Sequence, residues 1–162
     1  MTARTAADLA ALTPDEIDTR LVSLTAQRDT LEARRQTLTL IAQHGAGRAQ
    51  AAARADLARV EQQIRLAGEL LGELEAEFER RGGWPRVWVV PGGHAHRGRG
   101  CHTLHPTTRL VLAPRDIHGR ALSGADDERV VQALGYRACT VCYPDAPVER
   151  PSFVLLPEEG AR

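Results

Sequence analysis

The sequence of 162 residues contains no lysine and no asparagine, and only 4% of its residues are aromatic. All 21 basic residues are therefore arginine. Because lysine and asparagine have A/T-rich codons, the simplest interpretation is a gene from a GC-rich genome. In such a gene, frequent arginine does not by itself indicate phosphate or carboxylate recognition. The shortage of aromatic residues predicts a core built mainly from Leu, Val and Ala.

Long apolar runs and an excess of one charge are also absent. No run approaches the roughly 18 apolar residues of a membrane span, and the N-terminus lacks the apolar segment of a secretory signal. The 21 arginines balance 21 acids, which excludes a highly charged disordered chain as a description of the whole molecule. These features predict a cytoplasmic protein with no membrane partner.

The balanced total conceals one basic segment. Residues 84–120 contain six arginines and a single acid, Asp116, whereas the segments on either side carry more acids than arginines. A basic loop favours contacts with nucleic-acid phosphates, although the same pattern is typical of a solvated loop. The candidate phosphate contacts are Arg97, Arg99 and Arg109.

Residues 1–82 have the periodicity of two long helices. Thr13 suits a helix cap and Pro14 a first helical position, and the acids that follow suit the positive end of the helix dipole. Apolar residues then recur at alternating spacings of four and three, which places them on one helix face. The first seam consists of Ile17, Leu21, Leu24, Leu31 and Leu38, and the second of Ala53, Leu57, Val60, Ile64, Ala67, Leu71, Leu74 and Phe78.

The segment 44–47, which contains two glycines, separates the two seams. A glycine there is expected to end the first helix in the left-handed conformation, and the second helix is predicted over 48–81. So short a linker makes the helices antiparallel neighbours in a coiled-coil hairpin.

Two helices alone leave apolar surface uncovered, and Leu66 and Leu70 lie beside the second seam. We therefore expect self-association or docking of a protein partner through these helices, or alternatively packing of the hairpin on the C-terminal half. The charged residues on the outer faces are interpreted as a solvated surface.

Residues 84–150 are predicted to form a small separate domain, followed by a tail over 151–162. Strands are expected over 87–90 and 110–112, with a further strand over 153–156. Ser123 is expected to cap a helix that has acids in its first turn and ends at Gly135.

The three cysteines all lie within residues 101–142, and two of them form a Cys-x-x-Cys motif. Without an export signal this pattern favours a metal site over a disulfide. Zinc prefers a tetrahedral set of sulfur and nitrogen ligands. The predicted ligands are His96, Cys101, Cys139 and Cys142, with His94 and His105 as alternatives to His96.

Catalytic interpretations of the cysteines have less support. A redox dithiol of the thioredoxin type follows a strand, whereas Cys139 follows a predicted helix. A catalytic zinc needs an open position and a nearby base, and the loop 94–105 contains no carboxylate. We therefore predict a structural zinc ion and no enzymatic activity.

Several segments resemble a family of uncharacterised proteins that is common in actinobacteriophages and actinobacteria. The resemblance covers roughly residues 13–150, and its most specific part is Ala-Cys-Thr-Val-Cys-Tyr-Pro-x-Ala-Pro-Val over 138–148. It implies a bacterial cytoplasmic setting, that of the host if the gene is phage-encoded, and no established activity. Many relatives look as if they carry a second cysteine at the position of Leu104. The resemblance therefore implies either that one His and three Cys are the sufficient set here, or that His105 takes the place of the missing thiolate.

Together these patterns predict an α+β protein with an N-terminal antiparallel helical hairpin and a small zinc-stabilised β-β-α domain. The predicted function is that of a non-enzymatic zinc-binding interaction module. The alternative is a nucleic-acid-binding protein that uses the arginine-rich loop.

Overall fold

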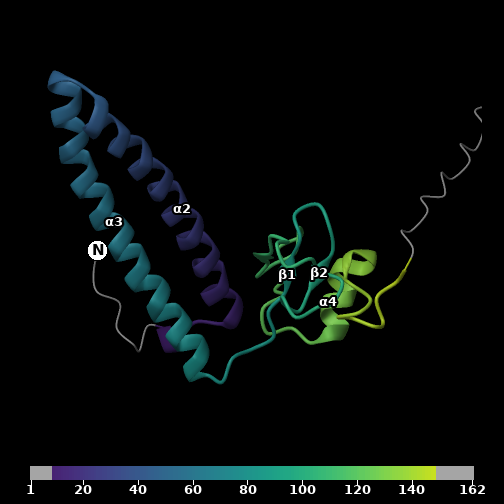
Figure 1. Cartoon of the computed structure of the whole chain (residues 1–162). Coiled ribbons are helices and arrows are strands. Elements are labelled where there is room, and N and C mark those ends of the chain that lie inside the picture. Colours follow the sequence, from purple (N-terminus) through teal and green to yellow (C-terminus); the bar gives the residue numbers. More distant parts are fainter. Residues whose placement is uncertain (1–8, 149–162) are drawn as a thin grey trace, which may run out of the picture.

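The computed structural model describes residues 9–148 and shows a long helical hairpin joined to a small domain of strands and short helices (Figure 1). This arrangement confirms the predicted α+β class. The strand predicted over 153–156 lies outside the described residues. The elements are α2 (Pro14–His44), α3 (Gly47–Arg80), β1 (Trp88–Val89), β2 (Ala95–His96), β3 (Val111–Leu112), α4 (Asp127–Leu134) and the 3₁₀ helix η1 (Gly135–Arg137).

The ends of α2 are fixed by a cap and a glycine. The Thr13 backbone N–H donates to the Glu16 carboxylate at 2.8 Å, which satisfies a donor that the helix itself leaves free. The prediction of a left-handed glycine at the end of α2 is wrong for Gly45, because this residue has an extended backbone with a φ of −73°. Gly45 is instead needed for space, because a Cβ there would lie 2.4 Å from the Ile41 carbonyl oxygen. The positive φ falls on Gly47, at the start of α3.

The hairpin is best packed at the end where it meets the small domain. A buried cluster there consists of Leu9, Ile17, Leu21 and Leu74. Further along α3 the buried seam residues are Ala53, Val60 and Ala67, whose small or branched side chains let the helices approach. No helix among residues 9–148 has the length and apolar content that a bilayer crossing requires.

The small domain is built on a three-stranded antiparallel sheet in the order β2-β1-β3, with Trp88 opposite both His96 and Leu112. The sequence pattern predicts a loop over residues 94–105, whereas the structure places the short strand β2 at its start. Four of the eight residues in the buried core of the domain are alanine, and the largest is Tyr143. The core of the small domain therefore contains only a small volume of apolar side chains.

The helix α4 begins later than expected, so the predicted capping role of Ser123 is wrong. The N-cap is Asp126, whose side chain accepts from the Arg129 backbone N–H at 2.9 Å. Ser123 lies before this cap in a turn completed by Gly124, which has a φ of +76° and packs against Pro14. Three residues of turn thus separate the expected cap from the helix.

Charged residues at the junction of hairpin and domain are buried, which corrects the interpretation of all outer charges as solvated. Asp18 is completely buried in α2, and Glu77 in α3 is only 6% exposed. The Arg86 guanidinium lies 2.8 Å from the Asp18 carboxylate, and Arg81 donates at 2.8 Å to the backbone carbonyl of Leu12. Asp18 accepts from Trp84 and Arg86 of the segment that leads into the small domain. Glu77 instead accepts from Arg80 and Arg81 at the end of α3.

Candidate metal centre

The Cys-x-x-Cys segment forms a tight turn directly after η1. The backbone N–H groups of Cys142 and Tyr143 both donate to the Cys139 carbonyl, at 3.0 and 2.8 Å. The Cys139 N–H in turn donates at 2.9 Å to the carbonyl of Ala95 in β2. This last bond places the turn beside β2, so the Cys-x-x-Cys motif is anchored to the sheet.

Cys101 stands in a second turn of similar construction. The Leu104 N–H donates to the Cys101 carbonyl at 3.0 Å. The Thr103 hydroxyl lies 3.1 Å from the Cys101 sulfur and 3.7 Å from the Cys139 sulfur. Sequence reasoning did not identify Thr103; the available signal was a hydroxyl two residues after a cysteine in a tight turn.

The structure brings His96, Cys101, Cys139 and Cys142 together. One potential ligand atom from each of them lies within 4.8 Å of all the others. The Cys101 and Cys139 sulfurs are 3.9 Å apart, and the Cys142 sulfur is 3.8 Å from His96 Nδ1. Around an ion at the usual zinc–sulfur distance of about 2.3 Å, tetrahedral ligands lie about 3.8 Å apart. The cluster therefore has the size of a tetrahedral metal site.

The structure also distinguishes the histidines. His96 is 4% exposed and points into the cluster from β2. The alternatives His94 and His105, and His102 as well, are exposed and do not belong to the cluster. The ring of His105 is instead 2.8 Å from the Thr107 hydroxyl.

Cys101 and Cys142 differ in their readiness to ionise. Burial raises the pKa of Cys101, but hydrogen bonds from Thr103 and His96 outweigh it and lower this pKa to about 6. Burial raises the pKa of Cys142 to about 11, and the nearby Cys101 thiolate adds to the rise although the Arg97 N–H opposes it. Ionisation of both Cys101 and Cys142 in so small a space would be favoured by a nearby cation.

A shallow hollow of about 390 Å³ lies beside the cluster, bordered by Cys101, His102, Cys142 and Arg97. None of the described residues that line it carries a carboxylate. The hollow therefore offers access to two of the sulfurs but no acidic group to act as a general base.

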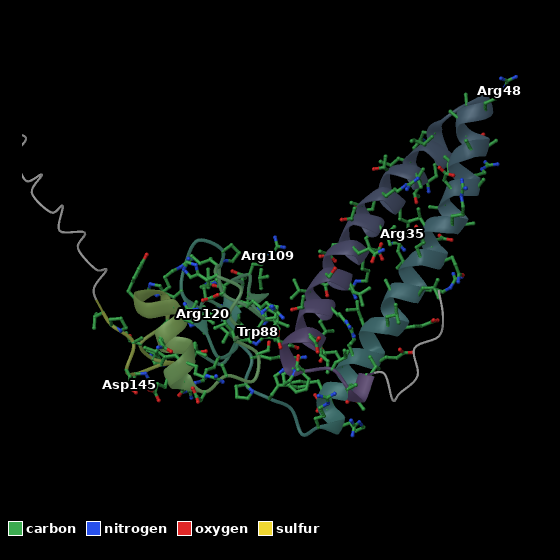
Figure 2. The ribbon with its side chains drawn as sticks, turned by 180° about the vertical axis from the view of Figure 1, so that it is seen from behind. Arg35, Arg48, Trp88, Arg109, Arg120 and Asp145 are labelled. Carbon is green, nitrogen blue, oxygen red and sulfur yellow. The ribbon has the colours of Figure 1, made fainter. Side chains whose placement is uncertain are left out.

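The three arginines considered for phosphate binding occupy different settings. Arg97 forms an ion pair with Asp127, and its guanidinium carbon lies 5.4 Å from the centre of the Tyr143 ring. Arg99 donates to the Thr108 carbonyl at 3.2 Å. Arg109 is exposed and projects from the edge of the small domain (Figure 2). Two of the three thus make contacts within the domain.

Comparisons of the chain with protein-family models, with curated proteins and with solved structures gave no match.

Proposed function

We propose that His96, Cys101, Cys139 and Cys142 bind one structural zinc ion and that the protein is a non-enzymatic interaction module. The single observation that supports this most strongly is the convergence of four ligand atoms within 4.8 Å. These atoms come from three segments of the chain, namely β2, the Cys101 turn and the Cys139 turn. Folding, and not only closeness in the sequence, is therefore needed to bring them together.

The ligand set favours zinc over other biological cations. Three thiolates and one imidazole are soft or borderline ligands, whereas calcium and magnesium prefer oxygen. A complete set of four protein ligands is typical of structural zinc sites, because catalytic sites keep one position for water. The set of ligands therefore supports a closed site whose metal ion stabilises the folded domain.

The structural role follows from the small core of the domain. A module of about 65 residues with an alanine-rich core gains little from apolar burial and needs a further cross-link. A metal joining β2, the Cys101 turn and the Cys139 turn supplies it, and its binding free energy then contributes directly to folding.

The hairpin supports the interaction role. It extends away from the small domain over most of its length (Figure 1), and it exposes large apolar side chains at Leu40, Ile41 and Leu66. Nucleic-acid binding through the basic loop has less support, because Arg97 is already paired with Asp127. The exposed Arg109 is the observation that favours it.

The experiment that tests the proposal is elemental mass spectrometry of the purified protein. We expect one equivalent of zinc in the wild type, and its loss in Cys139→Ser and His96→Ala. His94→Ala is the matched control, since it removes an exposed imidazole two residues away and should retain the metal. A folded wild type without metal would contradict the proposal.

A further inference from the structure

One face of α3 exposes apolar surface that the other residues of the described range 9–148 do not cover. Leu66 is 41% exposed, and Leu70 is half-buried beside it. Residues four apart lie on the same helix face, so the two leucines form one apolar patch. In both views α2 lies between α3 and the small domain, so α3 is the outer helix (Figures 1 and 2). Within the described part of the chain, the patch is accessible to a second molecule.

Two opposite charges flank this patch symmetrically. Arg59 and Glu73 each lie seven residues from Leu66 along α3, one towards the tip of the hairpin and the other towards its base. Because seven residues are close to two helical turns, all three side chains share one face. The Arg59 side chain is 74% exposed, and Glu73 is exposed as well. The face therefore has a positive end, an apolar centre and a negative end.

Such a face is complementary to itself. If a second copy packs with its α3 antiparallel and the two-fold axis passes beside Leu66, Arg59 lies opposite the partner's Glu73. Symmetry repeats this pair on the other side of the axis, because a two-fold contact uses the same surface twice. A parallel arrangement would instead place like charges opposite each other.

We infer that the occupant of this face is a second copy of the chain, bound through antiparallel α3 helices with Leu66 at the centre. This inference rests on the proposed interaction role of the hairpin and names its partner. The 34 residues of α3 extend for about 50 Å at 1.5 Å per residue. The contact therefore has room to approach the roughly 1,200 Å² of a specific interface.

One contact in the free chain changes in such a dimer. Arg59 forms an ion pair with Asp56 of the same helix. Ion pairs of this kind on a helix surface contribute little to stability, so exchange of Asp56 for the partner's Glu73 is not opposed strongly.

The test is sedimentation equilibrium over a range of protein concentrations, with two charge-reversal variants. Arg59→Glu and Glu73→Arg each create two like-charge contacts in a homodimer. We expect each to raise the dimer dissociation constant about tenfold or more. An equimolar mixture of the two variants should dimerise again, because both contacts in the mixed dimer join opposite charges.

The control is Glu61→Arg, which makes the same charge change on the opposite side of α3 and should leave the dimer unaffected. A wild type that stays monomeric, or a mixture that stays monomeric, would overturn the inference. A dimer insensitive to both single variants would overturn it too. Zinc content is measured in every sample, so failure of the dimer is distinguished from failure of the metal site.

Discussion

The indole N–H of Trp84 donates to the buried carboxylate of Asp18 at 2.9 Å. The other oxygen of Asp18 accepts from Arg86, whose guanidinium lies 3.7 Å from the centre of the Phe78 ring. Both donors belong to the segment that leads from α3 into β1. A carboxylate in the second turn of α2 thus holds the start of the small domain against the hairpin.

We predict that Asp18→Asn destabilises the protein strongly. The amide retains an acceptor for Trp84 but removes the buried counter-charge of Arg86, which keeps only its 3.1 Å ion pair with the exposed Glu75. Loss of one member of a buried ion pair costs about 3–5 kcal/mol. Urea denaturation followed by circular dichroism measures the change.

The control for this prediction is Asp29→Asn. The Asp29 side chain is 62% exposed and lies 3.9 Å from Arg28, so its charge should contribute almost nothing. Equal stability of the Asp18 and Asp29 variants would show that the buried pair does not hold the two parts together.

Zinc removal should affect the two parts of the molecule differently. The hairpin has its own apolar seam, whereas the small domain has an alanine-rich core. We expect a chelator to abolish the near-ultraviolet signal of Trp88 and Tyr143 while most of the helical far-ultraviolet signal persists. Zinc at 1,000 times its dissociation constant stabilises the folded domain by about 4 kcal/mol. Simultaneous loss of both signals would instead show that the hairpin depends on the metal.

Glu77 should make stability depend on pH in the acid range. Hydrogen bonds from Arg80 and Arg81 lower the pKa of Glu77 from 4.5 to about 2. A lowered folded-state pKa means that the carboxylate stabilises the fold above its unfolded pKa, and that this contribution is lost as the pH falls towards 2.

The measurement is the difference in unfolding free energy between wild type and Glu77→Gln as the pH is lowered. We expect a constant difference above about pH 5 and a progressive decrease below it. Zinc release in acid affects both proteins alike, so the difference isolates the carboxylate. A difference that does not change with pH would contradict this prediction.

We expect the arginines of the small domain to differ in their contribution to stability. We expect Arg97→Ala to lower stability by up to about 1 kcal/mol, because its exposed pair with Asp127 and its contact with Tyr143 are modest. Arg109→Ala should leave stability unchanged.

Fluorescence anisotropy with DNA and RNA oligonucleotides at several salt concentrations checks the alternative function. Phosphate contacts give affinity that falls steeply with salt. We expect no such binding by the wild type. Salt-dependent binding that is weakened by Arg109→Ala would favour the nucleic-acid alternative over the proposed interaction module.

The sequence by itself determined the helical hairpin and the chemistry of the cluster. Helix periodicity is local, so the seams from Ile17 to Leu38 and from Ala53 to Phe78 could be read without any distant contact. The Cys-x-x-Cys motif is local too, and together with a third cysteine and nearby histidines it favoured a metal site. The choice among histidines stayed open, because spacing allowed His94, His96 and His105 alike.

Only the tertiary structure decided which histidine faces the sulfurs and which charges are buried. His96 joins the cluster because β2 pairs with β1 and lies beside the Cys139 turn. Asp18 and Glu77 have the same local pattern as the solvated acids around them, yet both are buried. Asp18 meets Trp84 and Arg86 from beyond α3. Glu77 meets Arg81, which also binds the carbonyls of Leu9 and Leu12. Burial arises from contacts between residues far apart in the chain, which no local pattern specifies.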